Sequence, residues 1–247
     1  MAGHSKWSTI KRKKGEKDNA RAKVFTKISR EILVCIRENG SADPAVNSRL
    51  RDLIAKAKSN NIPNDNIDRL LKKAAGGEKN DYEHCVYEGY GPAGIAVLVS
   101  CLTDNRNRTA GEMRHYFDKC GGNLGNSGCV SFMFTEKGMV VVDNGDGDID
   151  PDAFMEQVLE LPGADDYAFV DGAIEVYCRA DTAVITALRE ALVGLGYTVF
   201  SAQTEQIPST YTALSEAADE VAFKKMTTLL DMLEDNDDVQ NVWHNWE

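Results

Sequence analysis

The sequence of 247 residues contains little histidine and no cysteine spacing that is typical of a metal site. Apart from His84 beside Cys85, its four histidines do not cluster with the cysteines, and no Cys-x-x-Cys pair occurs. Buried free thiols therefore explain the cysteines better than zinc ligands or disulfides do. The six are Cys35, Cys85, Cys101, Cys120, Cys129 and Cys178. We expect no metal and no other cofactor.

Long apolar runs are also missing. No stretch approaches the ~20 apolar residues that cross a bilayer, and no apolar signal-peptide core follows the charged start. A transit peptide is rich in Arg and poor in acidic residues, whereas Lys dominates here and Glu16, Asp18 and Glu31 intervene. We expect a cytoplasmic protein with no membrane partner.

The signatures of common enzyme sites do not occur either. There is no Gly-x-Ser-x-Gly, P-loop or zinc-protease spacing. Cys85 follows His84, but adjacency in sequence does not set up a nucleophile with its base. Residues 89–94 match the dinucleotide-binding pattern Gly-x-Gly-x-x-Gly, yet they precede a predicted strand instead of following one, which favours a glycine-rich turn. We expect a protein that is not an enzyme.

The acidic stretch 143–152 has carboxylates spaced as in a calcium-binding loop. When the loop is started at Asp146, Pro151 and Gln157 stand where calcium loops need Gly and Glu. We therefore prefer a solvated loop in which Asp150 caps a helix that begins at Pro151.

Positive charge is scarce overall but concentrated at one end. The chain has 28 Lys and Arg against 39 Asp and Glu, a net charge of −11. Residues 1–75 hold 18 basic and 8 acidic residues, a net charge of +10, and residues 76–247 hold 10 and 31, a net charge of −21. This bipolar distribution favours an oriented encounter with a polyanion, in which the N-terminal end leads.

The candidate contacts to nucleic acid lie in this basic end. Segment 6–17 has too few apolar residues to fold alone, and Trp7 offers an indole that can stack on an unpaired base. Farther along, three cations fall on one stripe of a predicted helix, roughly opposite its apolar stripe. The candidates are Lys6, Trp7, Lys11, Arg12, Lys13, Lys14, Lys17, Lys23, Lys27 and Arg30. The alternative is a solvated helix face with Trp7 packed on the helices.

A second candidate patch is the string TDNRNRT at residues 103–109. Thr109 and Glu112 predict a capping box, so Arg106 and Arg108 are expected near a helix N-terminus, where backbone donors and the helix dipole favour anions. Two arginines in that place can hold a phosphate. The alternative, that they pair with the surrounding carboxylates, stays open.

Apolar residues at three- and four-residue spacing predict three helices within 18–77 and thus a small bundle. We expect Asp43 to cap the second helix and Val46 to begin its buried stripe. A helix-turn-helix that reads DNA is disfavoured but not excluded, because the third helix opens with Asp65 and Asp68 where that motif approaches phosphates.

The period changes from about residue 86, which predicts strands and helices in alternation. We expect strands at 94–102, 128–134 and 211–215, a turn at 135–138, and a complete β-α-β-β-α-β unit of the ferredoxin-like kind at 138–206.

The fold class expected from this order is α+β: an N-terminal three-helix bundle followed by two α/β domains, ferredoxin-like or split βαβ, one inserted in the other. The predicted domains are 1–80, 81–136 plus 207–247, and the insertion 137–206.

Four strings resemble the YebC family, which includes bacterial probable transcriptional regulatory proteins and the mitochondrial translational activator of cytochrome oxidase subunit one. They are MAGHSKWSTIKRKKGEKDNARAKVFTKISREI, YEGYGPAG, TDNRNRTAGEMRH and GGNLGNSGCVSFMF. The resemblance runs nearly end to end and implies three domains, the third inserted in the second, and a role in gene expression without enzymatic activity. It adds Arg21 to the candidate residues and includes Arg106 and Arg108.

We therefore expect a nucleic-acid-binding regulator of gene expression. The resemblance implies either a DNA-binding transcriptional regulator or a ribosome-associated translation activator that contacts ribosomal RNA. The ribosome or a basic protein is a possible partner of the acidic domains, and the oligomeric state stays open. The alternative is an acidic protein-interaction adaptor that does not bind nucleic acid directly.

Overall fold

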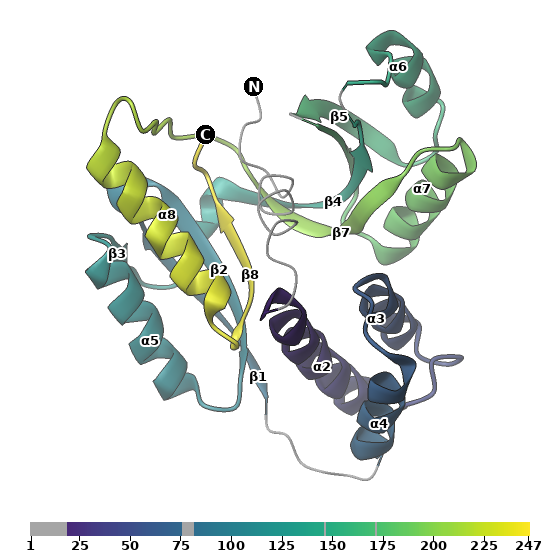
Figure 1. Ribbon diagram of the computed structural model, residues 1–247, viewed down its shortest axis with the longest axis horizontal. Helices are drawn as coiled ribbons and strands as arrows, with labels where there is room; N and C mark the ends of the chain where they lie inside the picture. The colour runs from purple at the N-terminus through teal and green to yellow at the C-terminus, as the bar shows by residue number, and fades with distance from the viewer. Residues whose placement is uncertain (1–18, 76–81, 146, 171) are drawn as a thin grey trace. The chain divides into compact units, whose positions relative to one another are not determined.

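The computed structural model describes residues 19–75, 82–145, 147–170 and 172–247 (Figure 1). These residues divide into two compact units. The first unit contains 19–131 and 214–244, apart from the gap at 76–81, and the second contains Phe132–Ala213 and Asn245–Glu247.

The first unit begins with the three predicted helices, which are confirmed. They are α2 (Asn19–Asn39), α3 (Ser48–Ser59) and α4 (Asn64–Ala75). Their apolar stripes meet in one core, because residues three and four apart share a helix face. The buried members are Ile28, Ile32, Cys35, Ile36, Leu50, Ala57, Ile62 and Ile67.

The start of α3 differs from the prediction. Its N-cap is Asn47, whose Oδ1 accepts from the Leu50 amide at 3.0 Å. Asp43 instead accepts from the Ala45 amide at 2.9 Å and closes a preceding turn. Val46 lies in that turn and is 74% exposed, so its predicted place in the buried stripe is wrong.

A four-stranded antiparallel sheet completes the described part of the first unit, in the order β3-β1-β2-β8. Helices α5 and α8 lie side by side on one face of this sheet (Figure 1). The elements are β1 (Glu83–Tyr90), the 3₁₀ helix η1 (Pro92–Gly94), β2 (Ala96–Thr103), α5 (Arg106–Lys119), β3 (Asn123–Leu124), α8 (Glu220–Asp235) and β8 (Val239–His244). Because β2 pairs with β8, segments far apart in sequence share one sheet.

The glycine-rich string before β2 serves close packing. A Cβ on Gly89 would lie 2.6 Å from the carbonyl oxygen of Asn123, and a Cβ on Gly91 would lie 2.7 Å from Met226 Sδ. Only glycine allows α5, β3 and α8 to approach the backbone this closely. The preference for a turn over a dinucleotide site is consistent with this geometry.

The second unit has the predicted order β-α-β-β-α-β and a sheet in the order β5-β6-β4-β7. Helices α6 and α7 cover one face, where Phe154 and Leu188 are buried with the strand residues. The elements are η2 (Ser131–Met133), which begins at the unit border, β4 (Phe134–Asp143), α6 (Pro151–Leu159), β5 (Ala164–Val170), β6 (Ala173–Cys178), α7 (Thr182–Gly194) and β7 (Val199–Pro208). Asp150 caps α6, as predicted.

The expected fold class is confirmed, as a helical region followed by two α/β arrangements. The strands of the second sheet lie between β3 and β8 of the first sheet in sequence. The exact borders of three domains, at residues 80, 136 and 206, stay a prediction.

The predicted strand at 128–134 is wrong, and Glu88 supplies the reason. The carboxylate of Glu88, which is 4% exposed, accepts from the backbone amides of Gly128, Val130 and Ser131 at 2.8–2.9 Å. Amides held by a carboxylate are not available to a neighbouring strand. These hydrogen bonds outweigh burial and lower the pKa of Glu88.

The predicted turn at 135–138 is also wrong, because β4 runs through these residues. Gly138 pairs with Cys178 on one side and Thr204 on the other. A Cβ on Gly138 would lie 2.5 Å from Cys178 Sγ, so this glycine permits strand packing and does not mark a turn. In the predicted strand 211–215, only a single bridge forms, from Thr212 to Trp246.

The substitution Glu88→Gln should lower the free energy of unfolding by about 1–3 kcal/mol, because a buried amide donor loses its acceptor. Urea denaturation measures this change. Glu83→Gln on the same strand is the matched control, since Glu83 is exposed. Equal shifts of the urea midpoint in the two variants would contradict the assigned role of Glu88.

Candidate nucleic-acid interface

Lys23, Lys27 and Arg30 lie along one side of α2, as their spacing predicts. The other side of α2 buries Ile28 and Ile32 in the bundle core. The helix is therefore amphipathic, with its cations outside the bundle. These three cations are called the basic stripe below.

The basic stripe lies against the acidic turn, defined as residues 234–238 at the C-terminal end of α8 and before β8. Lys23 Nζ donates to Asp235 Oδ1 at 2.6 Å. Lys27 Nζ donates to the carbonyl oxygen of Glu234 at 2.9 Å. The C-terminus of a helix carries partial negative charge, so its last carbonyl groups favour cations.

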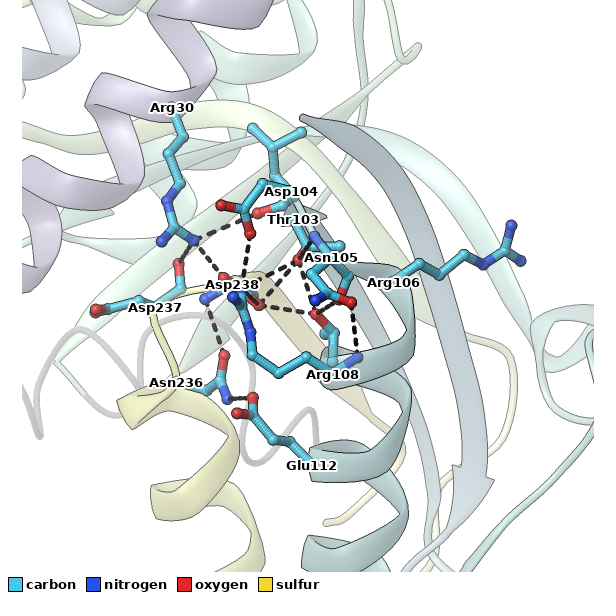
Figure 2. A network of polar contacts seen from close by, with 12 residues as sticks. Arg30, Thr103, Asp104, Asn105, Arg106, Arg108, Glu112, Asn236, Asp237 and Asp238 are labelled. Atoms are coloured by element: carbon cyan, nitrogen blue, oxygen red, sulfur yellow. Dashed lines mark hydrogen bonds and ion pairs between the residues drawn. The ribbon is translucent and has the colours of Figure 1, made fainter. Parts of the chain in front are cut away.

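Arg30 makes the most extensive of these contacts (Figure 2). Its Nη1 donates to Asp238 Oδ1 at 2.7 Å and to the carbonyl oxygen of Asp237 at 2.6 Å. The guanidinium carbon also lies 5.3 Å from the centre of the Tyr82 ring, which is a cation–π arrangement. Arg30 thereby contacts both the acidic turn and the residue just before β1.

Asp238 collects donors from several elements of the first unit. Its Oδ2 accepts from Arg108 Nη2 at 2.8 Å, from Thr109 Oγ1 at 2.8 Å and from Thr103 Oγ1 at 3.0 Å. The side chain of Asp238 is 4% exposed and that of Arg30 is 15% exposed. A buried carboxylate needs such partners, because an unpaired charge in the interior costs several kcal/mol.

The electrostatic consequences appear in both partners. Burial raises the pKa of Asp238, but hydrogen bonds from Arg108, Thr109, Arg30 and Thr103 outweigh it and leave the pKa below its usual value. The hydrogen bond to Asp238 raises the pKa of Arg108. The pair is therefore charged at neutral pH.

The N-terminus of α5 is built differently from the predicted capping box. The N-cap is Asn105, whose Oδ1 accepts from the Arg108 amide at 3.1 Å. Thr109 is buried in the first turns of the helix, and Glu112 accepts from Asn236 Nδ2 at 2.7 Å. Both predicted box residues thus take part in the contacts around the acidic turn instead of capping α5.

Arg106 and Arg108, the two arginines of the second candidate patch, point in different directions (Figure 2). Arg108 donates to Asp104 at 2.9 Å as well as to Asp238, which is the carboxylate pairing that was the alternative to a phosphate site. Arg106 points away from this network (Figure 2). It is exposed, and within the described residues its guanidinium has no hydrogen bond or ion pair. The structure therefore does not bring Arg106 and Arg108 together as a phosphate clamp.

The remaining predicted contacts fall outside what the structure describes. Arg21 belongs to α2, but its side chain is not described. The others, which lie outside the described residues altogether, are Lys6, Trp7, Lys11, Arg12, Lys13, Lys14 and Lys17.

Sequence reasoning missed four exposed cations of the bundle, which are Arg51 and Lys58 on α3 and Arg69 and Lys72 on α4. In the described part of the chain none of the four forms an ion pair. Their spacing of seven and three residues places each pair on one helix face. That spacing was the available signal.

The described ranges contain no group of three or more His, Cys, Asp or Glu side chains arranged to hold a metal ion. Within the same ranges, no helix has both the length and the apolar character needed to cross a bilayer.

Two family models match the chain. Residues 5–77 match the N-terminal domain of TACO1/YebC proteins, and residues 82–246 match the second and third domains of TACO1/YebC. The matches meet close to the gap between α4 and β1.

Several sequence relatives carry a regulatory name, and one solved structure is similar to this chain. A "Probable transcriptional regulatory protein" from Clostridium botulinum is 52% identical over 251 residues, covering 100% of this chain and 97% of that protein. One from Acetivibrio thermocellus is 49% identical over 247 residues, covering 100% and 99%. The crystal structure of the conserved hypothetical protein Aq1575 from Aquifex aeolicus is 39% identical, with a TM-score of 0.81 and coverage of 94% and 93%.

Asp238→Asn should lower the free energy of unfolding by about 3 kcal/mol at pH 7, because removing one partner of a buried ion pair costs about 3–5 kcal/mol and Arg108 remains partly solvated. Urea denaturation measures it. Asp237→Asn is the matched control, since that side chain is exposed and Arg30 contacts only its carbonyl oxygen.

The same pair of variants gives a pH test with a defined sign. The folded-state pKa of Asp238 is lowered, so its contribution is full above the ordinary carboxyl pKa of about 4 and is lost as pH falls through the lowered value. The stability difference between wild type and Asp238→Asn should therefore shrink below about pH 4. A difference that stays constant into the acid range would contradict the assignment.

Proposed function

The chain belongs to the TACO1/YebC family, and from that premise we propose that it is a non-enzymatic, nucleic-acid-binding regulator of gene expression in the cytoplasm. The observation that carries the proposal is the separation of charge, +10 in residues 1–75 and −21 in residues 76–247. Such a molecule approaches a polyanion with its basic end first.

The cations of the basic end have two different tasks in this proposal. The basic stripe is held by carboxylates and carbonyl oxygens of the acidic turn, which also binds Arg108 from outside the basic end, and these contacts hold the first unit together. Phosphate contacts fall to the segment 6–17 and to the exposed cations of α3 and α4. Trp7 supplies a stacking surface for an unpaired base.

Two kinds of target fit the basic end. Relatives named transcriptional regulatory proteins favour duplex DNA. Ribosomal RNA with its basic proteins offers a partner for each charged end of the molecule, because the acidic residues of 76–247 suit a basic protein surface. The binding experiment below includes both kinds of nucleic acid.

Reversing Lys11, Arg12, Lys13 and Lys14 to Glu should weaken nucleic-acid binding by about tenfold or more at about 0.1 M salt. With each phosphate contact that is lost, fewer counterions are released from the nucleic acid on binding. Fluorescence anisotropy with a short duplex DNA and with a structured ribosomal RNA fragment measures the affinities. The slope of log K against log salt should become less negative by about 3.

The matched control changes four exposed cations of residues 76–247 to Glu, so that the net charge changes by the same amount. They are Arg114, Lys119, Arg179 and Arg189. This variant should keep most of the affinity. If both variants lose the same affinity, only the net charge matters and the proposed interface is wrong. If the wild type binds neither nucleic acid but retains a basic protein, the adaptor alternative replaces the proposal.

A further inference from the structure

Cys85 and Cys101 stand directly opposite each other on the adjacent strands β1 and β2 of the first sheet. They are directly paired in the antiparallel register of β1 and β2, so their side chains lie on the same face. Directly opposed residues have Cα atoms about 4.5–5.5 Å apart, and a disulfide accepts about 4.4–6.8 Å. Their Cβ atoms, about 4.5–5.5 Å apart in an undistorted pair, need to approach by about 1 Å.

The sheet has a local irregularity at this place. The pairing of β2 with β8 shifts register between Ser100 and Cys101. A bulge interrupts the ladder beside the second cysteine, where strands bend more easily than in a regular sheet. The small approach that an S–S bond requires is therefore located beside a break in the regular ladder.

Cys85 lies near groups that favour a thiolate. A hydrogen bond with the Cys101 thiol has the largest effect on the pKa of Cys85, and burial opposes it. The Tyr87 hydroxyl and the Arg106 guanidinium lower the pKa further and Glu83 raises it, which leaves the pKa at about 7. The Tyr87 hydroxyl lies 3.2 Å from the carbonyl oxygen of Arg106, at the start of α5, and its single proton can be donated either to this oxygen or to the Cys85 thiolate. Arg106 does not contact Asp238, and its role in the first unit is to favour the Cys85 thiolate by its positive charge.

Cys85 is the more accessible member of the opposed pair. Strand β3 pairs with β1 only at Gly89 and Tyr90, so among the described residues the outer edge of β1 at Cys85 has no strand neighbour. Cys85 retains 7% exposure, whereas Cys101 is fully buried. An attacking thiol at the edge and a resolving thiol behind it are the arrangement that a dithiol oxidation needs.

We propose that Cys85 and Cys101 form a redox modification site, in which a peroxide converts the opposed thiols into a reversible cross-strand disulfide. The Cys85 thiolate attacks one oxygen of hydrogen peroxide, the O–O bond breaks, and the displaced hydroxide takes up a proton to leave as water. The Cys101 thiol then attacks the resulting sulfenic sulfur, the S–S bond forms, and a second water leaves. Two electrons pass from the dithiol to the peroxide, and a dithiol reductant reverses the step by exchange.

The other four cysteines serve as internal controls. Cys35 lies in the bundle, Cys120 ends α5, Cys129 lies in a loop and Cys178 lies in the second unit. Burial raises the pKa of Cys120, Cys129 and Cys178, which makes them poorer thiolates. Oxidation should therefore begin at Cys85. The hydrogen bond to Cys85 and burial raise the pKa of Cys101 as well, so Cys101 is selected as the second partner by its position directly opposite Cys85.

In the test, the native full-length protein is treated with hydrogen peroxide, and the peroxide is then removed with catalase. The chain is denatured, alkylated and digested for mass spectrometry. Trypsin leaves both cysteines in the peptide 80–106, and cleavage after Glu88 separates them. We expect a peptide that resists alkylation, is lighter by two hydrogens, and stays joined after cleavage at Glu88 until a dithiol is added. Cys101→Ser should trap Cys85 as a dimedone-reactive sulfenic acid, and Cys85→Ser should leave Cys101 reduced.

The proposal is overturned if both thiols remain alkylatable in wild-type protein at peroxide doses that oxidise the control cysteines, or if Cys85 links to a different cysteine. The wild-type measurement needs no substituted chain, so it stands even where a serine variant does not fold.

Discussion

A carboxylate in a protein interior must be matched by donors, and Asp238 draws them from α2, the end of β2 and the first turns of α5. Two arginines and two threonines therefore share one buried anion, and the geometry of the acidic turn follows from it. The same contact helps to fix α2 within the first unit, because Asp238 would lose one of its two guanidinium partners if Arg30 moved away. The stripe cations Lys23 and Lys27 extend the contact along the end of α8.

This internal pairing reduces the number of cations in the basic end that are available to bind nucleic acid. A sum over residues 1–75 counts every cation as available to a polyanion, whereas the three cations of the stripe are already bound to carboxylates and backbone carbonyl groups. The cations left for nucleic acid are fewer and lie elsewhere in the sequence, on the segment 6–17 and on the exposed faces of α3 and α4. In the basic end, positive charge thus has a structural task and, in our proposal, a binding task, carried by different residues.

Local periodicity predicted most of the elements, because helices and buried strands are patterns of near neighbours. It failed where a distant contact decides, as for Glu88 and Gly138, and where two neighbouring residues offer alternative caps, as at the start of α3. Glu88 withdraws the amides of 128–131 from a strand, Gly138 permits packing inside a strand where a turn was expected, and Asn47 caps α3 instead of Asp43. The role of the basic stripe could not be predicted either, because Arg30 and Asp238 are 208 residues apart and no nearby sequence pattern indicates their pairing. The direct opposition of Cys85 and Cys101 likewise becomes visible only with the strand register.

The division of the cations between structure and binding can be measured by comparing two variants that each lose two positive charges from the basic end. One is Lys23→Gln with Lys27→Gln in the basic stripe, and the other is Lys11→Gln with Lys13→Gln in the segment 6–17. We expect the slope of log K against log salt for nucleic-acid binding to stay unchanged in the stripe variant and to become less negative by about 1.4–1.8 in the other. Equal changes of slope in both variants would show that the stripe contacts phosphate and would contradict the division.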